Sequence, residues 1–219
     1  MRCLYYQLID STQNQAKKLI DLREINRPVS KQSFDVQVAQ KKVATARNAR
    51  VAFGDNSDFQ NKSNEVVAIV AEEQSAGRGQ YGKSWVSPKE AGLYVSIVLA
   101  SSTFASLMRD PIETSLTTVV AEAMIQSLNE FHRADYYIKP INDIYYDGCK
   151  LAGILVELYK GFAIIGIGLN LRMLNQEILV ETPKAPPISL EEIIGPNNLE
   201  SFDNVAFVDS VTSHILRLS

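Results

Sequence analysis

The pattern of apolar positions along the chain predicts more strands than helices. Apolar runs predict strands at Leu4–Leu8, Val66–Val70 and Leu93–Leu99, and the continuous run at Val66–Val70 is typical of a strand buried on both faces. Apolar residues recur at helical spacing in three segments, Gln13–Leu22, Ile112–Phe131 and Asn204–Leu218. Because the strands follow one another with few helices between them, the pattern favours an α+β fold over a doubly wound sheet.

The second half of the chain predicts antiparallel pairing. Asp147-Gly148 is a two-residue turn signal between Ile144–Tyr146 and Lys150–Leu158, so these segments are expected to form a β-hairpin. Tyr136–Ile138 and Phe162–Leu171 add a short and a long strand. We therefore expect a mixed, largely antiparallel sheet flanked by helices.

One region departs from this pattern. Ser30–Asn64 is rich in Gln, Lys, Asn, Ser and Asp and poor in large apolar residues. Within it, Phe34–Phe53 has roughly helical spacing, and the polar stretch after it is typical of an exposed loop. We interpret the whole region as an insertion or a mobile loop.

Composition narrows the class of protein. The 219 residues, 46% hydrophobic and 21% charged, suit one globular domain over residues 1–219. The net charge of −3 gives no basis for DNA binding. No apolar run reaches the about 18 residues of a membrane span, and no signal-peptide pattern is present, so we expect a cytoplasmic protein. Cys3 and Cys149 form no CxxC pair, so neither a disulfide nor a protein-bound metal is expected.

A dense run of glycine and charge, AGRGQYGKSW, follows the strand at Val66–Val70. Its three glycines allow backbone N–H groups to approach a ligand closely, and Arg78 and Lys83 can bind an anion. A dinucleotide fingerprint is excluded, because no helix follows the glycines. A mobile surface loop with solvated charges remains the alternative.

Three other stretches hold polar, charged or glycine residues that could contact a ligand. Asn142-Asp143 precedes the hairpin, and Lys150 begins its second strand, where an unpaired charge would be costly. Gly166–Asn170 places two glycines and an amide in a buried strand. Asp10-Ser11-Thr12 forms a helix N-cap cluster at the first strand-to-helix corner.

Taken together, five ordered motifs in this chain, DSTQ, QSAGRGQYGKSW, KPIND, KLAGILVE and GIGLN, resemble the catalytic domain of biotin protein ligases in the biotin/lipoate ligase superfamily. That family typically shows DSTN, QxxGRGRxGxxW, KWPND, KLAGILxE and GIGxN. The resemblance covers Tyr5 to about Leu171 outside the polar region. It implies a fold similar to class II aminoacyl-tRNA synthetases.

The resemblance implies ATP-dependent biotinylation of a lysine on a biotin carboxyl carrier protein domain, through biotinyl-5′-AMP, with Mg²⁺ accompanying ATP. It implies catalytic roles for Arg78, Lys150 and Asp143, with Asp143 as the base that takes the amine proton. Biotin contacts are expected from Ser11, Thr12, Gln13, Gln74, Arg78, Gly79, Gln80, Lys150 and Gly153. Contacts to ATP or the adenylate are expected from Lys83, Trp85, Lys139, Asn142 and Asn170.

Three departures from the family pattern matter. Gln80 stands where the family usually has a second arginine, which predicts weaker retention of the adenylate. Pro140-Ile141 replaces Trp-Pro, and Gln13 replaces an asparagine. Two alternatives stay open: a lipoate or octanoate ligase or transferase of the same superfamily, and a non-catalytic biotin-binding relative.

The extent of the resemblance carries further expectations. The chain begins at the first strand of the ligase domain, so no N-terminal DNA-binding domain is expected. The small C-terminal β-domain common in the family is not expected either. Some relatives form homodimers by extending the sheet, and the sequence leaves that question open.

Overall fold

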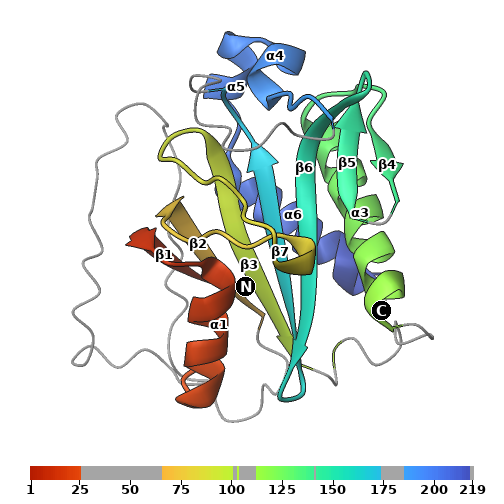
Figure 1. The fold of residues 1–219 in the computed structure, drawn as a ribbon. Helices are drawn as coiled ribbons and strands as arrows, with labels where there is room; N and C mark the ends of the chain where they lie inside the picture. The colour runs from red at the N-terminus through yellow and green to blue at the C-terminus, as the bar shows by residue number, and fades with distance from the viewer. Residues whose placement is uncertain (26–65, 101–102, 104–111, 141, 174–184, 218–219) are drawn as a thin grey trace, which may run out of the picture.

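A seven-stranded sheet organises the protein (Figure 1), seen in a computed structural model that describes residues 1–25, 66–100, 103, 112–140, 142–173 and 185–217. The strand order is β1-β2-β3-β7-β6-β5-β4. Their bounds are β1 Arg2–Ile9, β2 Val67–Gln74, β3 Gly92–Ala100, β4 Tyr137–Lys139, β5 Asp143–Tyr146, β6 Cys149–Tyr159 and β7 Phe162–Asn170. Only β1 and β2 pair in parallel, and the other neighbours are antiparallel. The expected mixed, largely antiparallel α+β sheet is therefore confirmed.

Helices cover both faces of this sheet. Helix α1, Thr12–Asp21, packs on β2, β3 and β7 on one face. Helices α3, Ile112–Phe131, and α6, Asn204–Arg217, pack against each other on the opposite face, where α3 also contacts β6 (Figure 1). The larger apolar core lies on the α3 and α6 side, and a smaller one lies under α1. The part of the α1 face that α1 leaves uncovered is open for a site.

Two features explain why the chain starts its first helix where it does. The Ser11 side chain caps α1 by accepting a hydrogen bond from the Gln13 backbone N–H, which satisfies one of the free donors of the first turn. The Asp10 carboxylate accepts a hydrogen bond from the Ser11 backbone N–H at 2.8 Å. The predicted N-cap cluster is thereby confirmed, and the helix begins one residue before the predicted Gln13.

The other elements follow the sequence closely. The hairpin turn at Asp147-Gly148 is confirmed, with both residues at positive φ, as a type I′ turn requires. Short helices η1 Gln80–Gly82, α4 Leu190–Ile194 and α5 Pro196–Glu200 were not predicted. The polar region Ser30–Asn64, including the candidate helix Phe34–Phe53, lies outside the described residues.

No helix within the described ranges is both long enough and apolar enough to cross a membrane.

Candidate functional site

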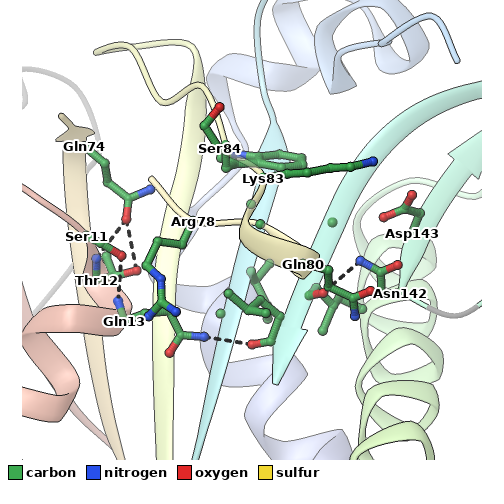
Figure 2. A pocket seen from close by; sticks show the side chains of 18 of the residues that line it. Ser11, Thr12, Gln13, Gln74, Arg78, Gln80, Lys83, Ser84, Asn142 and Asp143 are labelled. Carbon is green, nitrogen blue, oxygen red and sulfur yellow. Dashed lines mark hydrogen bonds between the residues drawn. The ribbon is translucent and has the colours of Figure 1, made fainter. Parts of the chain in front are cut away.

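A cavity of about 190 Å³ opens on the α1 face of the sheet, beyond the N-terminal end of α1 (Figure 2). Strand alternation puts Gly153 and Leu155 of β6 on this face, beside Gly166 and Gly168 of β7, so three of these four floor positions carry no side chain. Twelve of the predicted site residues, from four of the five sequence motifs, line the cavity together with Trp85, and Gly166 and Gly168 line it from the fifth motif. The twelve are Ser11, Thr12, Gln13, Gln74, Arg78, Gly79, Gln80, Lys83, Asn142, Asp143, Lys150 and Gly153.

One end of the cavity is a neutral hydrogen-bonded network. The Gln74 side-chain oxygen accepts hydrogen bonds from the Thr12 backbone N–H at 2.8 Å and from the Thr12 hydroxyl at 3.2 Å. The Ser96 hydroxyl donates to the Thr12 oxygen at 2.8 Å, and the Gln74 amide donates to the Ser87 hydroxyl at 2.8 Å. Because these groups hold one another in place, their orientation is set before any ligand binds.

Gln13 contributes an unsatisfied acceptor to the same end. Its amide nitrogen donates to the Leu155 carbonyl at 2.8 Å and lies over Gly166, where a Cβ would come within 2.8 Å of that nitrogen. Its oxygen is buried and has no hydrogen-bond partner in the described part of the chain. A buried acceptor without a partner costs free energy, and Gln13 is one of the residues that line the cavity.

The glycine loop, Gly77–Trp85, is folded on itself at the mouth of the cavity. The Gly79 N–H donates to the Lys83 carbonyl at 2.7 Å, and the Trp85 N–H donates to the Gly77 carbonyl at 2.9 Å. Tyr81, at the tip, has a φ of 57° and is 88% exposed. Its left-handed backbone is strained for a residue with a side chain, which is a feature often found in functional loops.

Trp85 ends the glycine loop and lies on the glycine floor. A Cβ at Gly168 would fall 2.5 Å from the Trp85 ring nitrogen, and a Cβ at Gly153 would fall 2.8 Å from its Cζ3 atom. Gly153 and Gly168 are register partners on neighbouring strands, so together they form a flat seat for the ring. The ring nitrogen is buried without a hydrogen-bond partner among the described residues.

The opposite end of the cavity carries charge. The Lys150 ammonium forms an ion pair with the Asp143 carboxylate at 2.8 Å and lies 5.2 Å from the centre of the Trp85 ring. Lys150, near the start of the buried strand, is therefore paired, as expected from the free-energy cost of an unpaired charge there. Asn142 is held by its amide, which donates to the Ile154 carbonyl at 3.1 Å.

The Arg78 side chain does not point toward this charged end. Figure 2 shows it on the α1 side of the cavity, with Asn142 and Asp143 across from it. Its two terminal nitrogens bind the Glu157 carboxylate at 3.0 and 2.9 Å, and one of them also donates to the Asn14 side-chain oxygen at 3.3 Å. The hydrogen bond from Asn14 also lowers the pKa of Asp10 below its usual value. Sequence reasoning missed Glu157 and Asn14.

Two predicted contacts lie outside the cavity lining. The Asn170 amide donates to the carbonyls of Lys150, at 3.3 Å, and Ile188, at 3.2 Å, so it fixes backbone next to Lys150. Lys139 is the register partner of Asp143, which puts it one strand beyond the cavity, with its ammonium 4.6 Å from the centre of the Tyr145 ring.

The segment that follows the glycine loop is anchored at Pro88. The Tyr94 hydroxyl donates to the Pro88 carbonyl at 2.9 Å, and burial raises the pKa of this phenol. Within the described ranges, no group of three or more His, Cys, Asp or Glu side chains could hold a metal ion.

Comparison with known proteins places this site in a family. The model of the biotin/lipoate A/B protein ligase family matches residues 45–172, which is more than half of the chain. The bifunctional ligase/repressor BirA of Escherichia coli is 38% identical over 116 residues, which make up 50% of this chain and 34% of that protein. The biotin–[acetyl-CoA-carboxylase] ligase of Mycobacterium tuberculosis is 30% identical over 117 residues, 51% of this chain and 42% of that protein.

Solved structures support the same assignment. The biotin protein ligase of Aquifex aeolicus in complex with biotin and ATP has a TM-score of 0.63 and 25% identity, covering 99% of this chain and 69% of that one. The Leishmania major biotin protein ligase, at 18% identity and a TM-score of 0.66 over 98% of this chain and 73% of that one, shows a shared fold. The expected biotin/lipoate ligase fold is therefore confirmed, and the chain belongs to the biotin/lipoate A/B protein ligase family.

Proposed function

We propose that this protein catalyses ATP-dependent biotinylation of a lysine on a biotin carboxyl carrier protein domain, through biotinyl-5′-AMP. The observation that carries the proposal is the convergence of all five sequence motifs on one cavity that has a neutral polar end and a charged end. The similarity to proteins named as biotin ligases, one of them solved with biotin and ATP, supports the same reaction.

The neutral end suits the ureido group of biotin. A ureido group offers two N–H donors and one carbonyl acceptor, and it carries no charge. Ser11, Thr12 and Gln74 supply hydroxyl and amide groups that are already oriented, and the Gln13 oxygen supplies an acceptor that lacks a partner. Using that buried acceptor gains a hydrogen bond and removes an existing cost.

The charged end suits adenylation. A biotin carboxylate oxygen attacks the α-phosphorus of ATP, forming a C–O–P bond while the bond from that phosphorus to the bridging oxygen breaks and pyrophosphate leaves with the electron pair. Both reactants are anionic, so the reaction needs positive charge at the phosphate. Lys150 and Lys83 line the cavity and supply it, and Trp85 forms a wall beside them.

Mg²⁺ is expected to arrive with ATP. This ion usually keeps several waters and is bound by substrate phosphates and one or two carboxylates. Asp143 is the one carboxylate among the described residues that line the cavity, which fits that mode, and the ion would neutralise phosphate charge.

Transfer of biotin needs a neutral amine. A lysine with a pKa of about 10.4 costs roughly 4 kcal/mol to hold neutral near pH 7.4. Asp143 would accept the amine proton as the nitrogen forms its bond to the acyl carbon and AMP leaves with the electrons of the C–O bond. Lys139 and Asn170 are proposed only as flanking and supporting residues, because neither lines the cavity.

The first experiment is release of pyrophosphate from MgATP with biotin, lipoate, octanoate or no acid. Release with biotin alone is the expected result. Release with lipoate or octanoate would replace the proposal with a sister activity of the superfamily.

A second candidate, a non-catalytic biotin binder, is favoured by one observation: Gln80 brings no charge to the cavity where the family pattern has an arginine. Calorimetry would identify this case as biotin binding without pyrophosphate release and without tightening by MgATP.

A further inference from the structure

We propose that Glu157 is a positioning residue that latches the glycine loop, Gly77–Trp85, over the cavity by holding Arg78. The inference rests on the proposed function only for the identity of the ligand. The latch itself is a property of the free protein.

Arg78 and Glu157 form a bidentate ion pair. Both terminal nitrogens of Arg78 bind the two Glu157 oxygens, at 3.0 and 2.9 Å, in the fork-to-fork arrangement that is the strongest form of this pair. The Glu157 side chain is 20% exposed and the Arg78 side chain is 37% exposed, so water screens the pair on the Arg78 side and less on the Glu157 side.

Glu157 is itself held in place. It follows Gly153 and Leu155 on the cavity face of β6, and its backbone is paired with Ile164 of β7, which restrains its position. Lys17 of α1 binds the same carboxylate at 2.8 Å. Two cations, Lys17 and Arg78, thus hold this one carboxylate from two sides.

The latch connects three parts of the cavity rim. Arg78 belongs to the glycine loop, Glu157 to β6, and Asn14, which also accepts from Arg78, to α1. Ser84 forms a backbone bridge with Arg78, so fixing Arg78 also fixes the second arm of the loop. Holding one side chain therefore restrains the whole loop up to Trp85.

The pair also assigns a role to Arg78. The edge of the guanidinium formed by its two terminal nitrogens is occupied by Glu157, so this edge does not bind a phosphate or carboxylate of the substrate while the pair is intact. Arg78 acts as the staple of the loop, and the backbone of the loop is what faces the ligand. Loss of Glu157 should therefore open the loop before any ligand is present.

The test uses Trp85, the one tryptophan of the chain, which ends the glycine loop. Acrylamide quenching of its fluorescence is measured in the ligand-free protein for the wild type and for Glu157→Gln. We expect the open fraction of the loop to rise by up to roughly fivefold, the upper end of the effect of losing one such ion pair. Lys17→Met is the matched control, because it removes the other cation on the carboxylate and leaves the Arg78 fork in place.

Kinetics provide the second readout. If biotin supports pyrophosphate release, the KM for biotin should rise severalfold in Glu157→Gln while kcat stays near the wild-type value, because an open loop lowers the binding-competent fraction. Arg78→Gln should give the same quenching as Glu157→Gln, and the double variant should add nothing to either.

Equal quenching in the wild type and Glu157→Gln, or equal increases in Glu157→Gln and Lys17→Met, would overturn the latch. A quenching difference in a protein that releases no pyrophosphate would support the latch and contradict the proposed function. The two proposals can therefore fail separately.

Discussion

Replacing Gly168 by alanine should displace Trp85 from the floor of the cavity. The added Cβ would lie 2.5 Å from the Trp85 ring nitrogen, whereas carbon contacts are favourable at about 3.5–4.0 Å. The ring must therefore retreat by about 1 Å or more. The strand cannot give way instead, since β7 is hydrogen-bonded to β3 on one side and to β6 on the other.

The size of the expected loss of stability follows from the rigidity of the strands beneath the Trp85 ring. Overpacking a well-packed position costs about 1–3 kcal/mol, so the free energy of unfolding of Gly168→Ala should fall by that amount. The fall is measured as a lower urea midpoint at an unchanged m-value. Trp85 emission should shift to the red as the ring meets water, and the biotin-dependent rate should fall. Gly153→Ala, with its Cβ 2.8 Å from the ring, should show a smaller effect in the same direction.

Gly79→Ala is the control in the same loop. Its Cβ would meet the Lys83 carbonyl at 3.4 Å, an ordinary contact, so Trp85 emission should not change. The reasoning is refuted if Gly168→Ala leaves the emission and the urea midpoint at wild-type values, or if Gly79→Ala shifts both as far as Gly168→Ala does.

Three further expectations can be tested with the same protein. Asn170→Ala removes the amide that holds the Lys150 carbonyl, and should lower kcat for pyrophosphate release by roughly tenfold with little change in the circular dichroism spectrum. Gln80→Arg adds a charge at the cavity and should slow loss of the adenylate, measured as retention of labelled AMP on a desalting column. The hydrogen bond from Asn14 lowers the pKa of Asp10 in the folded state. The stability that this carboxylate contributes is therefore present above the unfolded pKa of about 3.9 and is lost as the pH falls through the lower folded pKa. Asp10→Asn should make the urea midpoint depend less on pH over a range of roughly two pH units around that pKa, from about pH 5 to about pH 3.

Much of the fold could be predicted because the local signals agree with the tertiary structure. The turn at Asp147-Gly148 and the cap at Ser11 act within a few residues, so their chemistry is visible in the sequence. Helix α4 was missed because it has only five residues, although Ser189 and Glu192 form a capping box that the spacing shows. Short helices with two buried positions give no clear periodicity.

The candidate site, like the fold, could be predicted only in part. Motifs predicted which residues gather at the cavity, because each motif occupies one continuous loop, turn or strand segment. They could not predict what each side chain contacts, since that depends on partners far away in the chain. Arg78 and Glu157 are 79 residues apart, and Asn170 faces a carbonyl and not the cavity. Alternation from Gly153 along β6 is the one signal that could have placed Glu157 on the cavity face.

The balance of charge in the cavity bears on the order of the proposed half-reactions. In the free protein, Lys150 is bound to Asp143 and Arg78 is bound to Glu157, while Lys83 makes no ion pair within the described residues. Lys83 can therefore contribute positive charge directly, whereas Lys150 has to exchange a carboxylate oxygen for a phosphate oxygen when it binds the α-phosphate. Such an exchange costs little, because one anion replaces another. It also releases Asp143, and a carboxylate free of its lysine partner is a better proton acceptor for the incoming amine. Adenylation would in this way prepare the base that the transfer step needs.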